Sequence, residues 1–365
     1  MYIPFNDILN SPELFQNFVQ TLAPSFTLPR YPNYLADKYS EDRKWQAVAA
    51  VNGRVPMASL IDRNDGKPII GTEKPLDMNG TMPTFGNKVV FTSEEFNEIA
   101  RLERAIMSKV MPNSQELIAY VHNYFQRLAV GPLKTIDSLF YEAFSNGTST
   151  INAADNLGGL SMSINWGADK SFVTTVWSDS ANATGIDDLK KLKKHMKDKY
   201  GVIVDRFTMN DNTVNLLLAQ NSTKNYLSSY FGGSRVDIKW TGAPSLEAVN
   251  LLLTNNFGLP SIVVDDYMIS KYNADGKSEG TPFNAFMDGR VTAHVGSAMG
   301  QLLWTPADEQ RRPDTGVVYQ DVNHVLISKR SDRGKVTFES ELNAIPVPTA
   351  MIMNQAGVLV TDALS

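Results

Sequence analysis

The chain has 365 residues, 42% of them hydrophobic, and is long enough to bury the cores of more than one compact unit. It contains no cysteine, which excludes disulfides, a thiol nucleophile and thiolate metal sites. Its 34 basic and 39 acidic side chains give a formal charge of −5, the wrong sign for a surface that binds nucleic acid throughout. Neither a long apolar run nor an N-terminal secretion signal is present, so we expect neither a membrane protein nor a secreted one.

The first 45 residues combine short apolar pieces with prolines at positions 4, 12, 24, 29 and 32. Proline interrupts both helices and sheets, so this pattern allows no more than a turn or two of helix near residues 11–20. Such a segment buries little core of its own. We predict an arm that lies on a neighbouring molecule.

Residues 46–90 contain strand-like runs separated by turn dipeptides such as Asn52-Gly53 and Asn79-Gly80. This pattern predicts an extended β-loop. Residues 62–66 resemble the opening of a calcium-binding loop, but the glycine comes one position early and the downstream glutamate is missing. A hairpin turn is the preferred interpretation there.

Helical patterns begin abruptly after the loop. Thr92 and Glu95 have the spacing of a capping box, and apolar residues continue at helical spacing to Val110. Pro112 is expected to end this helix. A second helix is predicted to begin at Asn113 and to run to about residue 128, and a third covers residues 133–145.

The remaining sequence reads as strands on either side of an α/β unit. Residues 160–166 and 172–177 are predicted to form a long antiparallel pair. Beyond residue 180 the pattern predicts helices at 186–200, 214–230 and 245–257 and strands at 236–240 and 261–265, with the unit ending near residue 313. Strands return at 322–328, 335–340 and 357–360. We therefore predict one discontinuous domain with an α/β insertion.

The sequence contains little that points to catalysis. The four histidines are scattered, and none of the common hydrolase, zinc-protease, phosphate-loop or dinucleotide motifs occurs. Asp265 and Asp266 follow an apolar strand and could act as paired carboxylates for a metal or for acid–base chemistry. The preferred interpretation is a polar strand exit that caps a helix. We predict no catalytic, cofactor-binding or metal site, and no enzymatic activity.

Six lysines occur within residues 190–199, on one predicted helix. The preferred interpretation is a solvated helix face. The functional alternative is salt bridging between subunits, for which Lys190 and Lys194 are the candidates.

The order of these elements resembles the major capsid proteins of tailed phages, specifically the lambda-like capsid protein E family. Local sequence agrees at Met162-Ser-Ile-Asn-Trp-Gly, at Leu259-Pro-Ser-Ile-Val-Val-Asp-Asp, at Pro282-Phe, at Asp288-Gly-Arg-Val with Gly300, and at Ala344-Ile-Pro-Val-Pro through Val358-Leu-Val. The resemblance spans most of the chain. It is firmest from about Phe91 onward and weakest in the first 45 residues, and it depends on the ordered set rather than on any one motif.

The resemblance implies the α+β Hong Kong 97-like fold, with an N-terminal arm at 1–45, an E-loop at 46–90, a P-domain with a long spine helix at 91–178 and 321–365, and an A-domain at 179–320. It implies a structural protein of the virion, assembled in the host cytoplasm as pentamers and hexamers of an icosahedral shell. Scaffolding and portal proteins, and further a decoration protein, are the implied partners. The double-stranded DNA is enclosed without sequence-specific binding, and no cofactor is implied.

Some relatives of this fold fuse E-loop lysines to asparagines of neighbouring subunits. Lys67 and Lys74 lie in that region, but lambda-like members generally do not crosslink, so no crosslink is predicted. The resemblance makes the apolar residues of the arm and loop candidates for contacts between subunits. They are Phe5, Phe15, Phe18, Tyr31, Trp45, Leu60, Ile61, Ile69 and Ile70. The alternative for each is packing onto its own subunit.

Two other functions stay open at this point. An encapsulin-type compartment shell would share the fold but enclose enzymes. An α+β enzyme or binding protein would instead be a monomer with a ligand pocket.

Overall fold

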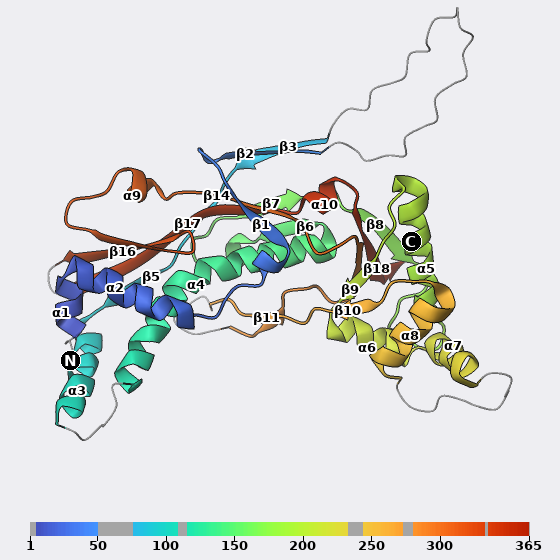
Figure 1. Cartoon of the computed structure of the whole chain (residues 1–365), viewed down its shortest axis with the longest axis horizontal. Helices are drawn as coiled ribbons and strands as arrows, with labels where there is room; N and C mark the ends of the chain where they lie inside the picture. The colour runs from blue at the N-terminus through green and yellow to red at the C-terminus, as the bar shows by residue number, and fades with distance from the viewer. Residues whose placement is uncertain are drawn as a thin grey trace, which may run out of the picture.

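The computed structural model describes residues 5–49, 76–108, 115–232, 244–272, 280–332 and 335–364. Helices and several sheets alternate along the chain, which confirms the predicted α+β class. The molecule is elongated, with the N-terminal helices at one end and a group of helices from the middle of the chain at the other (Figure 1).

The N-terminal segment forms two helices, α1 (Phe5–Asn10) and α2 (Pro12–Leu22). Ser11 caps α2 by accepting a hydrogen bond from the Leu14 N–H, and Pro12 occupies the first turn, where its missing N–H costs nothing. The prediction of only a turn or two of helix here is therefore wrong. The short helices η1 (Ala23–Ser25) and η2 (Tyr31–Asn33) lead into β1 (Leu35–Tyr39).

The predicted β-loop begins and ends as an antiparallel hairpin of β2 (Lys44–Ala49) and β3 (Leu76–Thr81), which stands above the body in Figure 1. Asn79 and Gly80 lie within β3, so the turn predicted there is wrong. The rest of the loop lies outside the described residues, including the hairpin turn predicted at 62–66, Leu60, Ile61, Ile69, Ile70, Lys67 and Lys74. The chain continues through β4 (Thr84–Phe85) and β5 (Lys88–Phe91).

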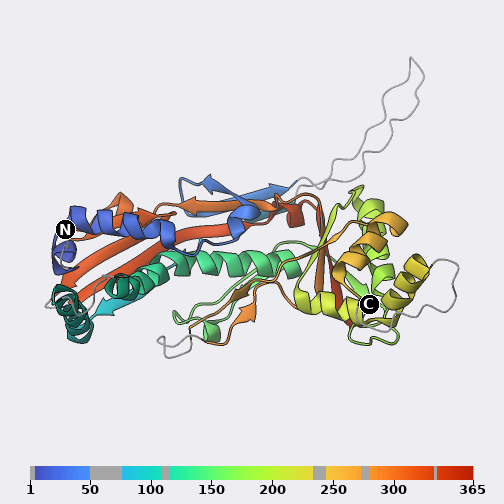
Figure 2. The same cartoon turned by 60° about the horizontal axis from the view of Figure 1, so that its bottom comes forward.

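Thr92 and Glu95 form the predicted capping box at the start of α3 (Ser93–Met107). The next two predicted helices are one continuous helix, α4 (Gln115–Asn146), with Pro132 inside it. Pro132 cannot donate a hydrogen bond to the carbonyl four residues earlier. Nearby, the Asn87 side chain donates to the Arg127 carbonyl at 3.2 Å. The helix runs along the body beneath the long strands (Figure 2).

The body is built on a seven-stranded sheet with the order β1-β14-β17-β16-β15, to which β4 and β5 add along β17. Its remaining strands are β14 (Gly300–Thr305), β15 (Val318–Val322), β16 (Val325–Asp332) and β17 (Lys335–Val347). β17 is 13 residues long and α4 packs against it. Three short helices complete the body, η3 (Ala153–Asp155), α9 (Asp308–Arg311) and α10 (Thr349–Ile352).

The predicted antiparallel pair at 160–177 does not form. Instead, β7 (Met162–Asn165) pairs with β6 (Thr148–Ile151), and β8 (Asp169–Val173) lies parallel to β18 (Ala356–Leu364). Each strand therefore finds its partner outside the predicted pair, and β18 lies far along the chain. β11 (Met268–Ile269) pairs with β12 (Phe283–Asn284).

A second sheet has the order β10-β9-β13-β18-β8. We call this sheet with helices α5 to α8 the insert. Its other elements are α5 (Gly185–Tyr200), β9 (Arg206–Met209), α6 (Asp211–Ala219), α7 (Asn221–Gly232), α8 (Leu246–Phe257), β10 (Ile262–Val264) and β13 (Arg290–His294). The predictions for α5, α8 and β10 are confirmed. The helix predicted at 214–230 is two helices, and the strand predicted at 236–240 lies outside the described residues.

Among the described residues, three groups of buried apolar side chains hold these elements together. The central core lies between α4 and the body sheet and includes Phe140 and Ile345. The insert core includes Leu189 and Phe207. The arm-end core joins α1 and α2 to α3, to the first half of α4 and to the body sheet, with Phe15 at its centre. The predicted domain boundaries stay predictions; the insert sheet includes β8 and β18 from outside residues 179–320.

Candidate functional site: a buried polar junction

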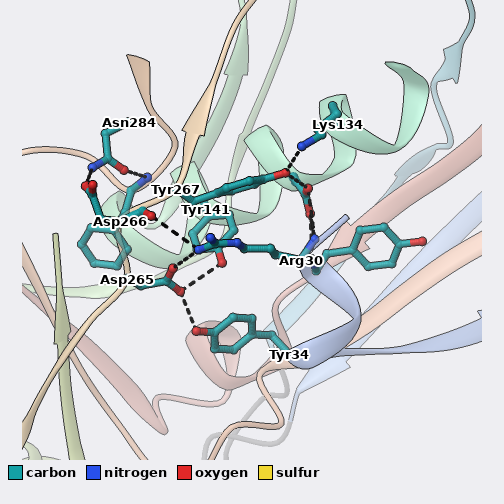
Figure 3. A network of polar contacts seen from close by, with 11 residues as sticks. Arg30, Tyr34, Lys134, Tyr141, Asp265, Asp266, Tyr267 and Asn284 are labelled. Carbon is teal, nitrogen blue, oxygen red and sulfur yellow. Dashed lines mark hydrogen bonds and ion pairs between the residues drawn. The ribbon is translucent and has the colours of Figure 1, made fainter. Parts of the chain in front are cut away.

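Asp265, one of the two acidic residues considered for chemistry, follows β10 and is only 7% exposed. Its Oδ2 accepts hydrogen bonds from the hydroxyls of Tyr34 at 2.6 Å and Tyr141 at 3.0 Å. Its Oδ1 lies 3.3 Å from Nη1 of Arg30. Figure 3 shows that these partners come from the arm and from α4, so Asp265 joins segments that are far apart in the sequence.

A second carboxylate, Asp137, lies fully buried on α4. Its Oδ1 accepts from the backbone N–H groups of Arg30 at 3.0 Å and Tyr31 at 2.7 Å, and its Oδ2 accepts from the Tyr267 hydroxyl at 2.8 Å. Lys134 in turn donates to the Tyr267 hydroxyl. The Arg30 guanidinium lies over the Tyr267 ring, 4.4 Å from its centroid. We call this network of Arg30, Tyr31, Tyr34, Lys134, Asp137, Tyr141, Asp265 and Tyr267 the polar junction.

Burial is the largest influence on the pKa values of the Asp137 carboxyl and of the Tyr34, Tyr141 and Tyr267 hydroxyls in the polar junction. It raises the pKa of the Asp137 carboxyl, while the hydrogen bonds from Tyr31, Tyr267 and Arg30 act in the opposite direction. Burial also raises the pKa of the Tyr34, Tyr141 and Tyr267 hydroxyls, so these groups stay protonated and act as donors. Burying a carboxylate is costly unless donors surround it. The three hydroxyls and two backbone N–H groups meet that requirement.

The polar junction holds chain segments together and shows no arrangement for catalysis. Every carboxylate oxygen of Asp137 and Asp265 already has a donor from the chain. Asp266 is exposed and accepts from Asn284, so the two neighbouring carboxylates have different partners. The strand exit at Asp265 is confirmed, but the predicted helix cap is wrong, because the chain continues to β11.

The described parts of the chain contain neither a candidate metal site nor a candidate membrane span. No group of three or more histidine, aspartate or glutamate side chains there could hold a metal ion. No helix there is long and apolar enough to cross a membrane.

An open depression of about 300 Å³ lies between the β4–β5 connection and the strands β16 and β17. Three glutamates line it, and each already binds a cation of the chain. Glu339 lies 2.8 Å from Lys88, Glu341 lies 3.4 Å from Arg43, and Glu309 pairs with Arg330. This surface is a salt-bridge network.

The candidate contact residues of the arm lie inside their own subunit. Phe5, Phe15, Tyr31 and Trp45 are at most 5% exposed, and Phe18 is partly buried against the arm-end core. Phe15 stacks on Phe338, with ring centroids 5.8 Å apart. Packing onto the subunit's own body therefore describes these five side chains. Phe5, Phe15 and Phe18 pack in the arm-end core, and Tyr31 and Trp45 pack in the central core. Their contact with other subunits stays a prediction.

The lysine-rich face of α5 is largely used within the chain. Lys190 bonds Asp187 at 2.8 Å and lies over the Phe257 ring, 3.8 Å from its centroid. Lys191 pairs with Asp188 at 3.2 Å. Lys194 is exposed to solvent. Salt bridging between subunits through Lys190 and Lys194 stays a prediction.

Most of the polar junction was not predicted from sequence, since its members are separated by more than 100 residues. One signal was present. Asp137 is a charged residue between Ile136 and Phe140 on the apolar face of a predicted helix, and a buried charge requires partners.

No protein-family model matches the sequence, and no curated protein matches it. Solved structures are similar over almost the whole chain. A protein assigned as a prophage capsid protein of E. coli CFT073 is 11% identical, with 95% of this chain and 97% of that chain covered and a TM-score of 0.49. The capsid of cyanophage A-1(L) is 12% identical, with 93% and 94% covered and a TM-score of 0.46. A virus-like particle from Pyrococcus furiosus is 10% identical, with 98% and 100% covered and a TM-score of 0.38. At these identities and TM-scores the similarity assigns no role to any residue of this chain.

Proposed function

We propose that this chain is the major capsid protein of a tailed bacteriophage, a subunit that builds an icosahedral shell around double-stranded DNA. The observation that carries the proposal is the hairpin of β2 and β3 at the edge of the body (Figure 1), which packs on the central core through Trp45, Ala47 and Met78. Among the described residues, these two strands pair only with each other. A two-stranded hairpin is marginally stable in water by itself. A surface on another molecule would add to the support that the central core gives this hairpin.

A second copy of the chain is the partner that fits best. Each copy carries the same hairpin, so a contact between the hairpin of one subunit and the body of the next repeats around a ring and closes into an assembly. Many modest contacts then add up to a stable shell. The net charge of −5 agrees with a wall that confines DNA without binding it over its surface.

The proposal extends to the partners of the chain and to where it assembles. Pentamers and hexamers would form in the host cytoplasm with the help of scaffolding and portal proteins, with a decoration protein as a further candidate, and the finished product would be the virion. Lys194 and the unpaired edges of the hairpin are candidate contacts. No catalytic role is proposed, because the buried carboxylates hold chain segments together.

Negative-stain electron microscopy of the purified chain at high concentration, with size-exclusion chromatography, tests the proposal. Closed shells, pentamers or hexamers are expected. Co-purified DNA supports a phage capsid, whereas enclosed enzyme would indicate an encapsulin-type compartment. A chain that stays monomeric at every concentration, also when co-expressed with the neighbouring genes of its source genome, would overturn the proposal in favour of a binding protein or enzyme.

A further inference from the structure

Three segments meet in the polar junction, namely the root of the arm at residues 30–34, the middle of α4, and the segment at residues 265–267 through which the chain leaves the insert (Figure 3). Arg30 contacts both of the other segments. Its backbone N–H donates to Asp137 on α4 at 3.0 Å, and its guanidinium binds Asp265 at the exit of the insert. Tyr34 adds a second bond from the arm to Asp265.

The exit segment is attached to the body at two points. Asp265, Tyr267 and Ile269 are buried while the residues between them are exposed, as in an extended chain with one face on the body. Asp265 accepts hydrogen bonds from Tyr34 of the arm and from Tyr141 of α4. The Tyr267 hydroxyl donates to Asp137 at 2.8 Å. Two attachments on one short segment fix its direction where the chain leaves the insert, in addition to the contact of β13 with α4 through Thr292 and the Phe144 carbonyl.

We propose that the polar junction is a latch that couples the docking of the arm to the docking of the segment through which the chain leaves the insert. If the arm root leaves, Asp265 loses Arg30 and Tyr34 and keeps only Tyr141. Asp137 loses the N–H groups of Arg30 and Tyr31 and keeps the Tyr267 hydroxyl. A buried carboxylate with too few donors is strongly unfavourable, so the exit segment moves to water.

The coupling acts in both directions, because the coupling free energy by which docking of the arm favours docking of the exit segment is the same as that by which the exit segment favours the arm. Displacement of the exit segment separates Asp265 from Arg30 and Tyr34 and so weakens the docking of the arm. The arm root also connects directly to the body sheet. The Tyr34 carbonyl accepts from the Met299 N–H at 2.8 Å, and β1 follows immediately, paired with β14. A shift at the latch therefore reaches the body sheet.

Hydrogen–deuterium exchange of the unassembled chain, followed by mass spectrometry, tests the latch in the variant Tyr34→Phe. The change removes one donor to Asp265 from the arm side. We expect about tenfold faster exchange at residues 30–39 and also at residues 262–269, the factor that corresponds to one such hydrogen bond. Tyr141→Phe removes the donor to the same oxygen from α4, and it should likewise accelerate exchange in both segments.

Tyr226→Phe is the matched control, because the Tyr226 hydroxyl also donates to an aspartate, Asp187 at 3.0 Å, but within the insert. It should leave residues 30–39 unchanged. If Tyr34→Phe accelerates exchange only at residues 30–39, or in neither segment, the latch is overturned. Should Tyr34→Phe fail to fold, Arg30→Lys gives the same two readouts with a milder change.

The latch is a property of the single chain, and only its use during assembly rests on the proposed function. Exchange is measured below the concentration at which shells form. A negative result there leaves the capsid proposal standing, and a failure to form shells leaves the latch standing.

Discussion

The arm and the hairpin were both predicted to be extensions without a core, but in the structure the two segments differ in how much of a core they form. The arm buries Phe5, Phe15 and Val19 in the arm-end core, with Phe15 and Val19 fully buried. The hairpin strands β2 and β3 pair only with each other among the described residues. A segment rich in proline can thus supply much of a core, while a segment with good strand patterning adds only a few side chains, Trp45, Ala47 and Met78, to one.

The difference comes from what each segment faces. Phe15, Val19 and Leu22 recur at helical spacing and form an apolar stripe along α2. This stripe meets Phe125 of α4 and Phe338 of β17. The described part of the hairpin meets the central core at its base, where Trp45 packs on Trp166 with ring centroids 5.7 Å apart and Ala47 and Met78 pack beside them.

The largest expected effect tests the arm. Phe15→Ala removes a fully buried ring between Phe125 and Phe338, and it should lower the free energy of unfolding by about 3 to 5 kcal/mol. Urea unfolding followed by circular dichroism measures the loss. Phe172→Ala, at a side chain of a residue that is 46% exposed, is the matched control and should change much less. A loss below about 1 kcal/mol for Phe15→Ala would mean that the arm is not docked in solution.

A smaller loss of stability is expected from a substitution at the base of the hairpin, where the hairpin meets the body. A Cβ at Gly80 would lie 2.9 Å from Nε1 of Trp45, so Gly80→Ala must displace the indole and should cost about 1 to 3 kcal/mol. A shift of the tryptophan fluorescence should accompany this loss. Gly158→Ala, where the nearest atom lies 3.6 Å away, serves as the control. Equal stability of the two variants would place the base of the hairpin outside the body.

The arm root should respond to pH in a way that the hairpin cannot. Burial raises the pKa of Asp137 above its ordinary value of 3.8, so the folded chain holds this proton more tightly than the unfolded chain. The resulting stability is fully present below pH 3.8 and is lost as the pH rises through the raised pKa. The titratable side chains that interact with this carboxyl are Lys134, Tyr267, Tyr31 and Tyr141.

Asp137→Asn removes this dependence. The stability of the variant relative to the wild type should therefore increase as the pH rises above 3.8, as measured by urea unfolding in a pH series. A relative stability that stays constant across the series would show that Asp137 does not titrate as a buried group.

The smallest effect on stability is expected from the hairpin itself. Replacing residues 48–77 by Asn-Gly keeps the strand pairs from Lys44 and Thr81 to Ala47 and Met78 and closes them with a two-residue turn. The free energy of unfolding should change by less than about 0.5 kcal/mol, while shells should no longer form in electron microscopy. Normal shells from this variant would show that the hairpin is not the contact between subunits.

The sequence correctly predicted the elements that depend on residues close together in the chain, such as a helix cap or a run of apolar residues at helical spacing. The capping box at Thr92 and Glu95 is confirmed, as are α5 and α8. Pro12 was taken as an interruption but begins a helix, and the helices predicted to end near residue 128 and to begin at 133 are one helix, α4, which contains Pro132. Whether a helix tolerates a proline depends on how the flanking residues pack in the folded chain, and a single sequence does not show that packing.

The remaining errors concern partners that are distant in the sequence. β8 pairs with β18 almost 190 residues later, which alternation alone cannot indicate. Asp265 was correctly placed at the end of a strand, but its partners Tyr34 and Tyr141 lie 231 and 124 residues away. A polar residue next to an apolar strand shows that partners are needed, without showing which ones.

Pro132 divides α4 between two cores. Phe125 and Leu128 belong to the arm-end core, and Ile136 and Phe140 belong to the central core. The helix lacks one hydrogen bond at this point, so bending costs less here than elsewhere along it. In the proposed shell, five-fold and six-fold positions would require one sequence to adopt slightly different curvatures. We expect α4 to take up that difference at Pro132, with each core moving as a rigid piece.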